Sequence, residues 1–216
     1  MHAVTNAAAG LLVMDVDSTL ITGEVIEMLA EHAGSAELVT QITERAMRGE
    51  LDFAASLHER VATLAGLPVS VLDDVRAQMR LSPGARELVA AVQERGWAVG
   101  LVSGGFVELV TPLAASLGIS LVRANRLEVG DGRLTGRVTG AVVDRAAKAV
   151  ALRDYAASVG VDLAATVAIG DGANDLDMLA TAGFGIAYNA KPVVAQQADA
   201  TIEGRLDAAL TLAPFA

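Results

Sequence analysis

The chain has 216 residues, of which 53% are apolar and 19% charged, and it contains no cysteine. This length suits one ordinary domain, or one domain with a modest insertion, and the apolar content excludes a disordered chain. The formal net charge is −10, from 16 basic and 26 acidic residues. Because an acidic surface repels phosphate backbones, we expect no nucleic-acid partner. Without cysteine, disulfides, thiolate metal sites and Cys nucleophiles are all excluded.

No stretch of the sequence approaches the roughly 20 apolar residues that cross a bilayer, and residues 1–10 lack the basic start of a signal peptide. We therefore expect no membrane association and a cytoplasmic location. The three histidines, His2, His32 and His58, show no metal-ligand spacing. Any bound metal ion would have to be a hard cation held by oxygen atoms.

Short apolar runs, typical of strands buried on both faces, recur at residues 11–14, 98–102, 166–169 and 184–187. Between them, helical periodicity predicts helices at residues 84–95, 107–117 and 145–159. Gly96, Gly118 and Gly160 follow these helices, where a left-handed residue is favoured. This alternation predicts an α/β fold with a doubly wound parallel sheet.

Two segments depart from the alternation. Residues 126–138 alternate around a Gly-Asp-Gly turn, which predicts an antiparallel β-hairpin attached to the sheet. Residues 22–80 contain no strand-like run and suit about four consecutive helices. We therefore predict a catalytic α/β core, residues 1–21 and 81–216, and a helical-bundle cap domain, residues 22–80, inserted between the first two core strands.

Polar side chains follow three of the predicted strands, in residues 15–19 (DVDST), 103–105 (SGG) and 170–175 (GDGAND). Each segment alone could be a turn or a helix cap, but turn chemistry does not explain three strand ends of the same kind. Ligands of open α/β sheets bind at this edge. Clustered acids need a cation among them, and oxygen ligands select Mg²⁺, usually together with a substrate phosphate. The pattern therefore indicates phosphate chemistry.

These three segments and Lys148 resemble the four ordered motifs of the haloacid-dehalogenase-like (HAD) hydrolases, over nearly the whole chain. Residues 103–106 (SGGF), 134–136 (LTG) and 191–192 (KP) are similar to the phosphoserine phosphatases of that family. The resemblance implies a HAD-like Rossmann-type core. It also implies Mg²⁺-dependent hydrolysis of O-phospho-L-serine to L-serine and phosphate, a step of serine biosynthesis.

The resemblance also implies the catalytic roles. Asp15 would attack phosphorus and form an aspartyl-phosphate intermediate. Asp17 would protonate the leaving alkoxide and later deprotonate the attacking water. Lys148 would bind the phosphoryl group and neutralise the charge that develops on it and on Asp15. From the sequence alone, a lysine in the first turn of a helix would more often be solvated.

The implied metal site holds Mg²⁺ through Asp15, Asp171 and the backbone carbonyl of Asp17, with Asp175 orienting these ligands. The hydroxyl of Ser103 and the amide of Gly104 would bind phosphate oxygens at a helix N-terminus.

Asn174 has two interpretations. It could lie near the phosphate, or it could cap the helix that begins around residue 175.

The predicted cap carries the residues that would recognise the rest of the substrate. On the helix around residues 52–65, Arg60 falls on an apolar stripe with Phe53, Leu57 and Leu64. Arg60 could extend to water from the edge of this stripe, or it could bind a substrate carboxylate in a closed pocket.

Glu24 could favour the first turn of a helix, or it could bind a substrate ammonium. The resemblance implies that Glu24, Met47, Phe53 and Arg60 line the substrate pocket.

Three other functions stay open at this point. A phosphotransferase similar to phosphoserine:homoserine phosphotransferase would use an alcohol in place of water. A phosphatase for another small metabolite would have no use for Glu24 and Arg60 together. A non-catalytic phospho-ligand sensor would not need Asp15 and Asp17. The expected partner is a small phosphomonoester, and we expect a monomer or a homodimer.

Overall fold

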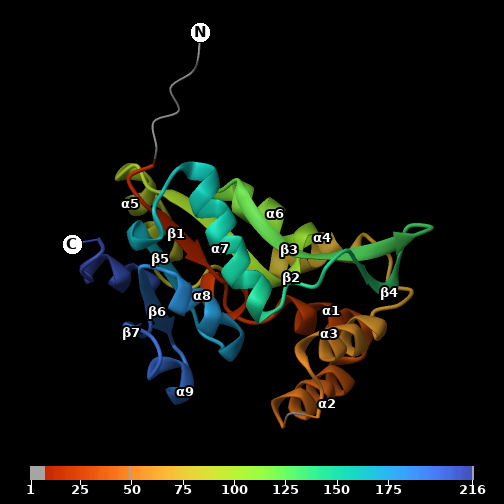
Figure 1. Cartoon of the computed structure of the whole chain (residues 1–216). Coiled ribbons are helices and arrows are strands. Elements are labelled where there is room, and N and C mark those ends of the chain that lie inside the picture. The colour runs from red at the N-terminus through yellow and green to blue at the C-terminus, as the bar shows by residue number, and fades with distance from the viewer. Residues whose placement is uncertain (1–7, 49, 216) are drawn as a thin grey trace.

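The computed structural model describes residues 8–48 and 50–215, and the side chain of Met47 lies outside this description. A seven-stranded sheet forms the centre of the molecule, with the strand order β4-β3-β2-β1-β5-β6-β7 (Figure 1). All neighbouring strands pair in parallel except β3 and β4, which form the antiparallel hairpin. The strands are β1 Leu11–Met14, β2 Ala98–Phe106, β3 Leu121–Gly130, β4 Arg133–Thr139, β5 Thr166–Gly170, β6 Phe184–Tyr188 and β7 Ala200–Ile202. The predicted α/β fold is confirmed.

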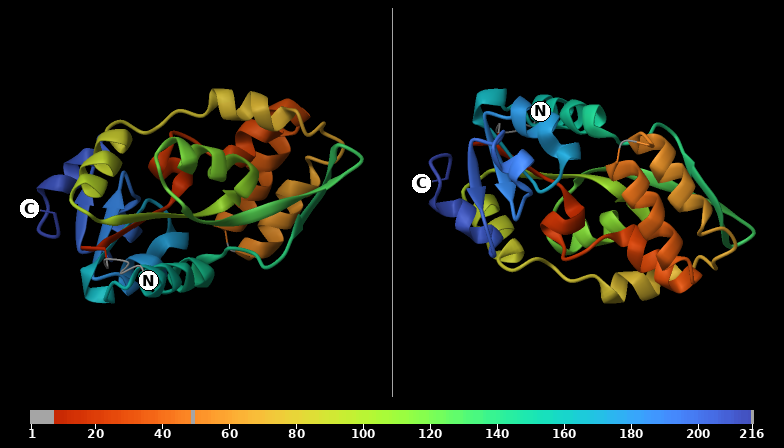
Figure 2. Two further views of the ribbon diagram at one scale, coloured as in Figure 1. Left: turned by 90° about the horizontal axis from the view of Figure 1, so that it is seen from above. Right: turned by 90° about the horizontal axis from the view of Figure 1, so that it is seen from below.

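Helices cover both faces of the sheet (Figure 2). Because side chains alternate along a strand, Leu12 and Met14 of β1 pack with α5 and α6, whereas Leu11 and Val13 pack with α7 and α8. All four side chains are fully buried. The helices are α1 Val25–Ala33, α2 Ala36–Met47, α3 Phe53–Ala62, α4 Val71–Gln78, α5 Ala85–Glu94, α6 Val107–Ser116, α7 Arg145–Val159, α8 Leu176–Thr181 and α9 Pro192–Ala195. None of the described helices is long and apolar enough to cross a membrane.

Helix ends follow the sequence signals closely. Gly96, Gly118 and Gly160 all adopt the left-handed conformation after α5, α6 and α7, with φ of 77°, 70° and 70°. The strands differ more from the prediction. The hairpin strand β3 begins at Leu121, because its first half also pairs in parallel with β2. The three-residue strand β7 is too short to leave a periodic signal.

Helices α1 to α4 form the helical insert, residues 22–80, which lies beyond the carboxyl end of β1 (Figures 1 and 2). The chain enters and leaves the insert side by side, since Ile21 and Leu81 form an antiparallel bridge. At its far corner, the loop between α3 and α4 is bonded to the hairpin. Gly66 N donates to Leu134 O and Leu134 N donates to Leu67 O, both at 2.8 Å. Backbone hydrogen bonds therefore hold the insert at two separate places.

Candidate active site

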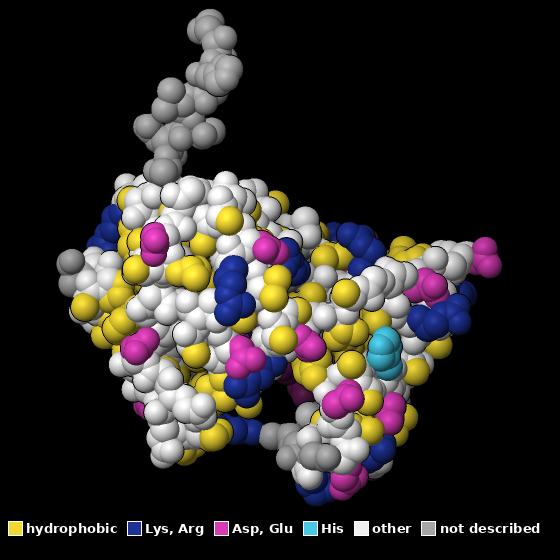
Figure 3. Space-filling view, viewed as in Figure 1, with side chains coloured by type: hydrophobic (Ala, Val, Ile, Leu, Met, Phe, Trp, Pro, Cys, Tyr) yellow, Lys and Arg dark blue, Asp and Glu magenta, His cyan; other side chains and the backbone are white. Residues whose placement is uncertain are grey.

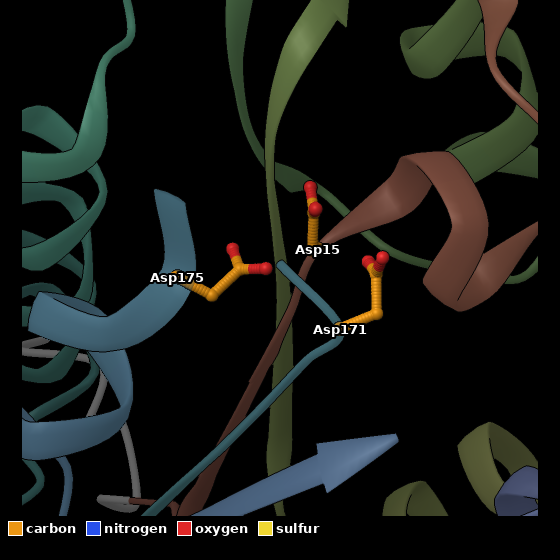
Figure 4. A group of neighbouring side chains, drawn as sticks. All are labelled: Asp15, Asp171 and Asp175. Atoms are coloured by element: carbon orange, nitrogen blue, oxygen red, sulfur yellow. The ribbon is translucent and has the colours of Figure 1, made fainter. Parts of the chain in front are cut away.

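Three carboxylates meet where β1 and β5 end (Figure 4). The two strands are neighbours, with Met14 opposite Ile169, so the residues that follow them lie side by side. One oxygen each from Asp15, Asp171 and Asp175 lies within 4.8 Å of the others. Asp15 is 3% exposed and Asp175 fully buried. The sequence prediction that these acids converge agrees with this geometry.

Lys148 reaches this cluster from the first turn of α7. The N-cap residue Asp144 accepts a hydrogen bond from Ala147 N at 2.8 Å, which fixes where the helix begins. The fully buried Lys148 Nζ lies 2.8 Å from Asp15 Oδ1 and 2.7 Å from Asp175 Oδ1. Lys148 is therefore an internal counter-ion and not the solvated lysine that helix position alone would suggest.

The charges of the cluster do not balance. Burial, reinforced by the charge of Asp175, raises the pKa of Asp15 well above its usual value even though Lys148 lowers it. Burial also raises the pKa of Asp171 to about 6, although the Thr19 hydroxyl donates to Asp171 Oδ1 at 2.8 Å and lowers it. Three carboxylates share the single ammonium group of Lys148. The atoms of this cluster that could bind a metal ion are all carboxylate oxygens. This donor set fits a hard divalent cation.

Asp17 lies in a tight turn, Val16–Leu20, directly after β1. Its Oδ1 accepts from Val25 N at 2.8 Å, and its Oδ2 accepts from the Ser103 hydroxyl at 2.9 Å. Burial raises the pKa of Asp17, and these two hydrogen bonds only partly oppose the rise. A carboxyl group that retains a proton beside a cluster of carboxylates can act as a general acid and then as a base.

The positions of Ser103 and Gly104 differ from the prediction. They do not lie at a helix N-terminus, because β2 continues to Phe106 and α6 begins only at Val107. The close packing here explains the glycines. A Cβ on Gly105 would lie 2.7 Å from Asp17 Oδ2, and one on Gly104 would lie 3.0 Å from Phe53 Cζ of the insert.

Glu24 and Arg60 bring charge to the site from the insert. Glu24 is the N-cap residue of α1 and accepts from the Ser18 hydroxyl at 2.7 Å. Burial, together with the charge of Asp17, raises its pKa to about 7. Arg60 on α3 is half-buried, and burial lowers its pKa while the charges of Glu24 and Asp17 raise it. Arg60 is therefore partly buried and close enough to Glu24 and Asp17 to be affected by their charges.

Arg60 differs from Lys148 in having no partner of opposite charge in contact. The only hydrogen bond of its guanidinium group within the described residues runs from Nε to Ser56 O, at 3.3 Å. No carboxylate of residues 8–48 and 50–215 lies within 4 Å of its guanidinium group. The space-filling view shows a hollow between the α/β part of the molecule and the insert, with acidic side chains visible inside (Figure 3).

A family model for haloacid dehalogenase-like hydrolases matches residues 12–180. This chain belongs to that family. The HAD hydrolase is 57% identical over 189 residues to a phosphoserine phosphatase of Streptococcus thermophilus, with 88% of each chain covered. It is 59% identical over 195 residues to one of Streptomyces coelicolor and 58% identical over 192 residues to one of Mycobacterium tuberculosis. These two matches include 90% and 89% of this chain but only 48% and 47% of the relatives. The chain therefore spans about half the length of these two relatives.

Solved structures give the same family. A substrate-bound phosphoserine phosphatase complex matches this hydrolase with a TM-score of 0.88 and 40% identity, over 93% of this chain and 96% of the other. A phospho-aspartyl intermediate analogue of phosphoserine phosphatase matches with a TM-score of 0.87 and 40% identity, over 93% and 97%.

The side chain of Met47 lies outside the described part of the structure, so its place in the pocket stays a prediction. For Asn174, the capping alternative is wrong. Asn174 lies inside a short turn, Ala173–Asp175, and α8 begins at Leu176 with Asp175 as its N-cap.

Sequence reasoning did not assign a role to Thr19, Ser18 or Asn125. Thr19 could have been found, because it belongs to the DVDST motif that follows the first predicted strand. Ser18 has a left-handed backbone, with φ of 55°, and its hydroxyl fixes Glu24. Asn125 carries no motif signal, because its partners come from β2 and from the segment before α7.

Proposed function

We propose that this chain is a Mg²⁺-dependent phosphoserine phosphatase of the cytoplasm, which hydrolyses O-phospho-L-serine to L-serine and phosphate. The observation that carries the proposal is the pairing of two halves of a site. Asp15 and Asp17 follow β1, while Glu24 and Arg60 face them from the insert. The names of the relatives support the same reaction. In this proposal residues 22–80 are a cap domain over a core of residues 1–21 and 81–216.

The first step uses Asp15 as the nucleophile. Its carboxylate is held by Val16 N, which donates to Oδ1 at 2.7 Å, and by the ion pair with Lys148. An oxygen of Asp15 forms a bond to phosphorus as the bond from phosphorus to the serine oxygen breaks. The proton on Asp17 goes to the departing serine oxygen, so serine leaves as a neutral alcohol.

The second step reverses the proton movement. Asp17 takes a proton from a water molecule while the water oxygen bonds to phosphorus and releases Asp15. Mg²⁺, held by Asp15, Asp171 and the backbone carbonyl of Asp17, with Asp175 orienting these ligands, would supply charge neutralisation to the phosphoryl group. Lys148 stays in place through both steps, because Asp15 and Asp175 anchor it from two sides.

The remaining residues of the site suit the rest of phosphoserine. The planar guanidinium group of Arg60 can bind the substrate carboxylate through two hydrogen bonds, and Glu24 can bind its ammonium group. Phe53 and Met47 would line the pocket between them. On the phosphate side, Ser103, the amide of Gly104 and Asn174 would bind phosphoryl oxygens.

The test is phosphate release from a panel of phosphomonoesters, with Mg²⁺ and with a chelator. We expect phosphoserine to be preferred over sugar and nucleotide phosphates, and the chelator to abolish turnover. Asp15→Asn should be inactive and Arg60→Ala should lose the preference. Arg76→Ala is a matched control, because Arg76 on α4 makes the same kind of bond, from its Nε to Leu72 O at 3.2 Å. Turnover by Asp15→Asn would rule out the covalent mechanism, and an unchanged preference in Arg60→Ala would rule out this substrate.

A further inference from the structure

The end of β2 contains two more residues than the strand beside it. Val102 lies opposite Arg123 and Phe106 lies opposite Asn125, so residues 103–105 of β2 face only Ala124 of β3. Such a bulge breaks the ladder of hydrogen bonds and leaves backbone groups that need other partners. These unpaired groups belong to the segment that would bind phosphate.

The side chain of Asn125 supplies the missing partner. It is 2% exposed, and its Nδ2 donates to Gly104 O at 2.8 Å. Its Oδ1 accepts from Val143 N, also at 2.8 Å. A carbonyl needs a donor and an N–H needs an acceptor, so these two partners fix the orientation of the amide group.

The peptide group that joins Gly104 to Gly105 is held at both ends. Asn125 binds its carbonyl oxygen, and its N–H donates to the Ser103 hydroxyl at 2.7 Å. Neither glycine has a side chain to resist rotation of this peptide group, so these two hydrogen bonds set its orientation. If the group turned over, the carbonyl dipole would take the place of the N–H beside Ser103.

The orientation of this peptide group reaches the proposed acid–base residue. The Ser103 hydroxyl accepts one hydrogen bond from Gly105 N, and it gives its single hydrogen to Asp17 Oδ2 at 2.9 Å. Asn125, the peptide group, Ser103 and Asp17 therefore form one continuous chain of hydrogen bonds. Asn125 also binds Val143 N, one residue before the N-cap Asp144 of the helix that carries Lys148.

We propose that Asn125 is a positioning residue for catalysis: by holding the 104–105 peptide group it sets the hydroxyl of Ser103 on Asp17 and keeps the phosphate-binding bulge in register with α7. Asn125 touches neither the substrate nor the reacting atoms. The inference rests on the proposed phosphatase function, but it concerns the phosphoryl end of the site and not the amino-acid end.

The test is Asn125→Asp, which keeps the size of the side chain and the acceptor for Val143 N but replaces the donor to Gly104 O with an oxygen. Changing a residue that orients the ligands of a metal site costs about 10–100-fold in activity, and Asn125 orients its site in the same indirect way. We expect kcat to fall by this factor for both phosphoserine and p-nitrophenyl phosphate. The KM for phosphoserine should change by less than about threefold, because Glu24 and Arg60 are untouched.

A double-mutant cycle with Ser103→Ala separates positioning from general damage. In the Ser103→Ala background the path to Asp17 is already cut, so Asn125→Asp should cost less than about threefold in kcat. Equal costs in both backgrounds would overturn the proposal, as would a kcat for Asn125→Asp within about twofold of wild type.

Gln93→Glu is the matched control. Gln93 Nε2 also donates to a backbone carbonyl, Leu117 O at 3.1 Å, but at the amino end of the sheet. This variant should keep the kcat of wild type, and an equal loss would show that any lost amide donor has the same effect. Thermal melting checks folding. If Asn125→Asp does not fold, Asn125→Ser is measured for the same fall in kcat at nearly constant KM, because its hydroxyl cannot reach both backbone groups.

Comparing phosphoserine with p-nitrophenyl phosphate distinguishes a failure of the proposed phosphatase function from a failure of the proposed role of Asn125. Wild type that hydrolyses p-nitrophenyl phosphate but not phosphoserine would contradict the proposed function and still test Asn125. Wild type active on both, with no selective loss in kcat for Asn125→Asp, would contradict the positioning role alone.

Discussion

Lys148 on α7 and Arg60 on α3 are two cations of one site, the first fully buried and the second half-buried. Lys148 contacts Asp15 and Asp175 at 2.8 and 2.7 Å. Although burial lowers its pKa, these two charges outweigh burial and raise it. Arg60 has no such contact within the described residues, and burial lowers its pKa. One cation is neutralised by the chain itself, and the other has its charge available for a ligand.

The difference between Lys148 and Arg60 separates residues that hold the site together from residues that recognise a ligand. A buried ion pair within the chain keeps reacting groups in place, but it offers nothing to a ligand. A half-buried charge without a contact costs stability until a ligand of opposite charge arrives. Variants of the two cations should therefore separate stability from specificity.

Lys148→Met should have the largest effect, on both activity and stability. Removing one partner of a buried ion pair leaves the other charges without compensation and costs about 3–5 kcal/mol of unfolding free energy. We expect kcat to fall by at least about 10³-fold, because the charge on the phosphoryl group is no longer offset. Urea unfolding and phosphate release measure the two losses. Lys191→Met is the control, since Lys191 is exposed. If Lys148→Met had the same unfolding free energy as wild type, the proposed difference between Lys148 and Arg60 would be wrong.

Arg60→Met should affect recognition and leave stability almost unchanged. Loss of a buried charge pair with a ligand costs about 2–5 kcal/mol, so kcat/KM for phosphoserine should fall by about 10²-fold or more. For p-nitrophenyl phosphate, which has no carboxylate, we expect a change below about threefold. If Arg60→Met lost as much unfolding free energy as Lys148→Met, the two cations would not differ in the way described.

Glu24 predicts how substrate binding depends on pH. Its pKa of about 7 means that the carboxylate is lost as the pH falls below this value. The KM for phosphoserine should therefore rise by up to about tenfold per pH unit below pH 7. In Glu24→Gln this dependence should disappear, whereas Glu27→Gln, an exposed neighbour on α1, should keep it. A KM for wild type with the same pH profile as Glu24→Gln would contradict the role in ammonium binding.

Asp171 predicts a smaller effect on the stability of the metal-free protein. Its pKa rises from 3.8 to about 6 on folding, so folding favours the protonated form. This contribution is complete below about pH 4 and is lost as the pH rises through about 6. We expect the melting temperature without metal to decrease by several degrees over this range, and Asp171→Asn to reduce the decrease. Asp74→Asn, on the exposed side of α4, is the control. Added Mg²⁺ should restore stability at neutral pH only when Asp171 is present.

The sequence predicts the fold well where local signals and packing agree. Residues 145–159 become α7 with both ends as expected, because an Asp N-cap precedes the helix and a glycine follows it. The acids after β1 and β5 converge because parallel neighbours end at one edge. Sequence periodicity could not show that β2 runs on through Ser103–Gly105, since the bulge depends on the register with β3.

The sequence predicts which residues form the site, but not the hydrogen bonds and ion pairs between them. Asp15, Asp17 and Asp171 stand in motifs, whereas the charge state of each depends on burial and on contacts from distant segments. Asn125 shows the limit most clearly. Its two partners lie 21 and 18 residues away along the chain, and only the folded sheet brings them together.

The two lines of backbone hydrogen bonds that hold the insert restrict how a ligand enters. One line lies at the paired chain segments around Ile21 and Leu81, and the other joins the loop after α3 to the hairpin. A rigid body fixed along two separate lines cannot swing about one without breaking the other. Opening the site to a ligand by a movement of the whole insert would therefore require one of these two sets of backbone hydrogen bonds to break.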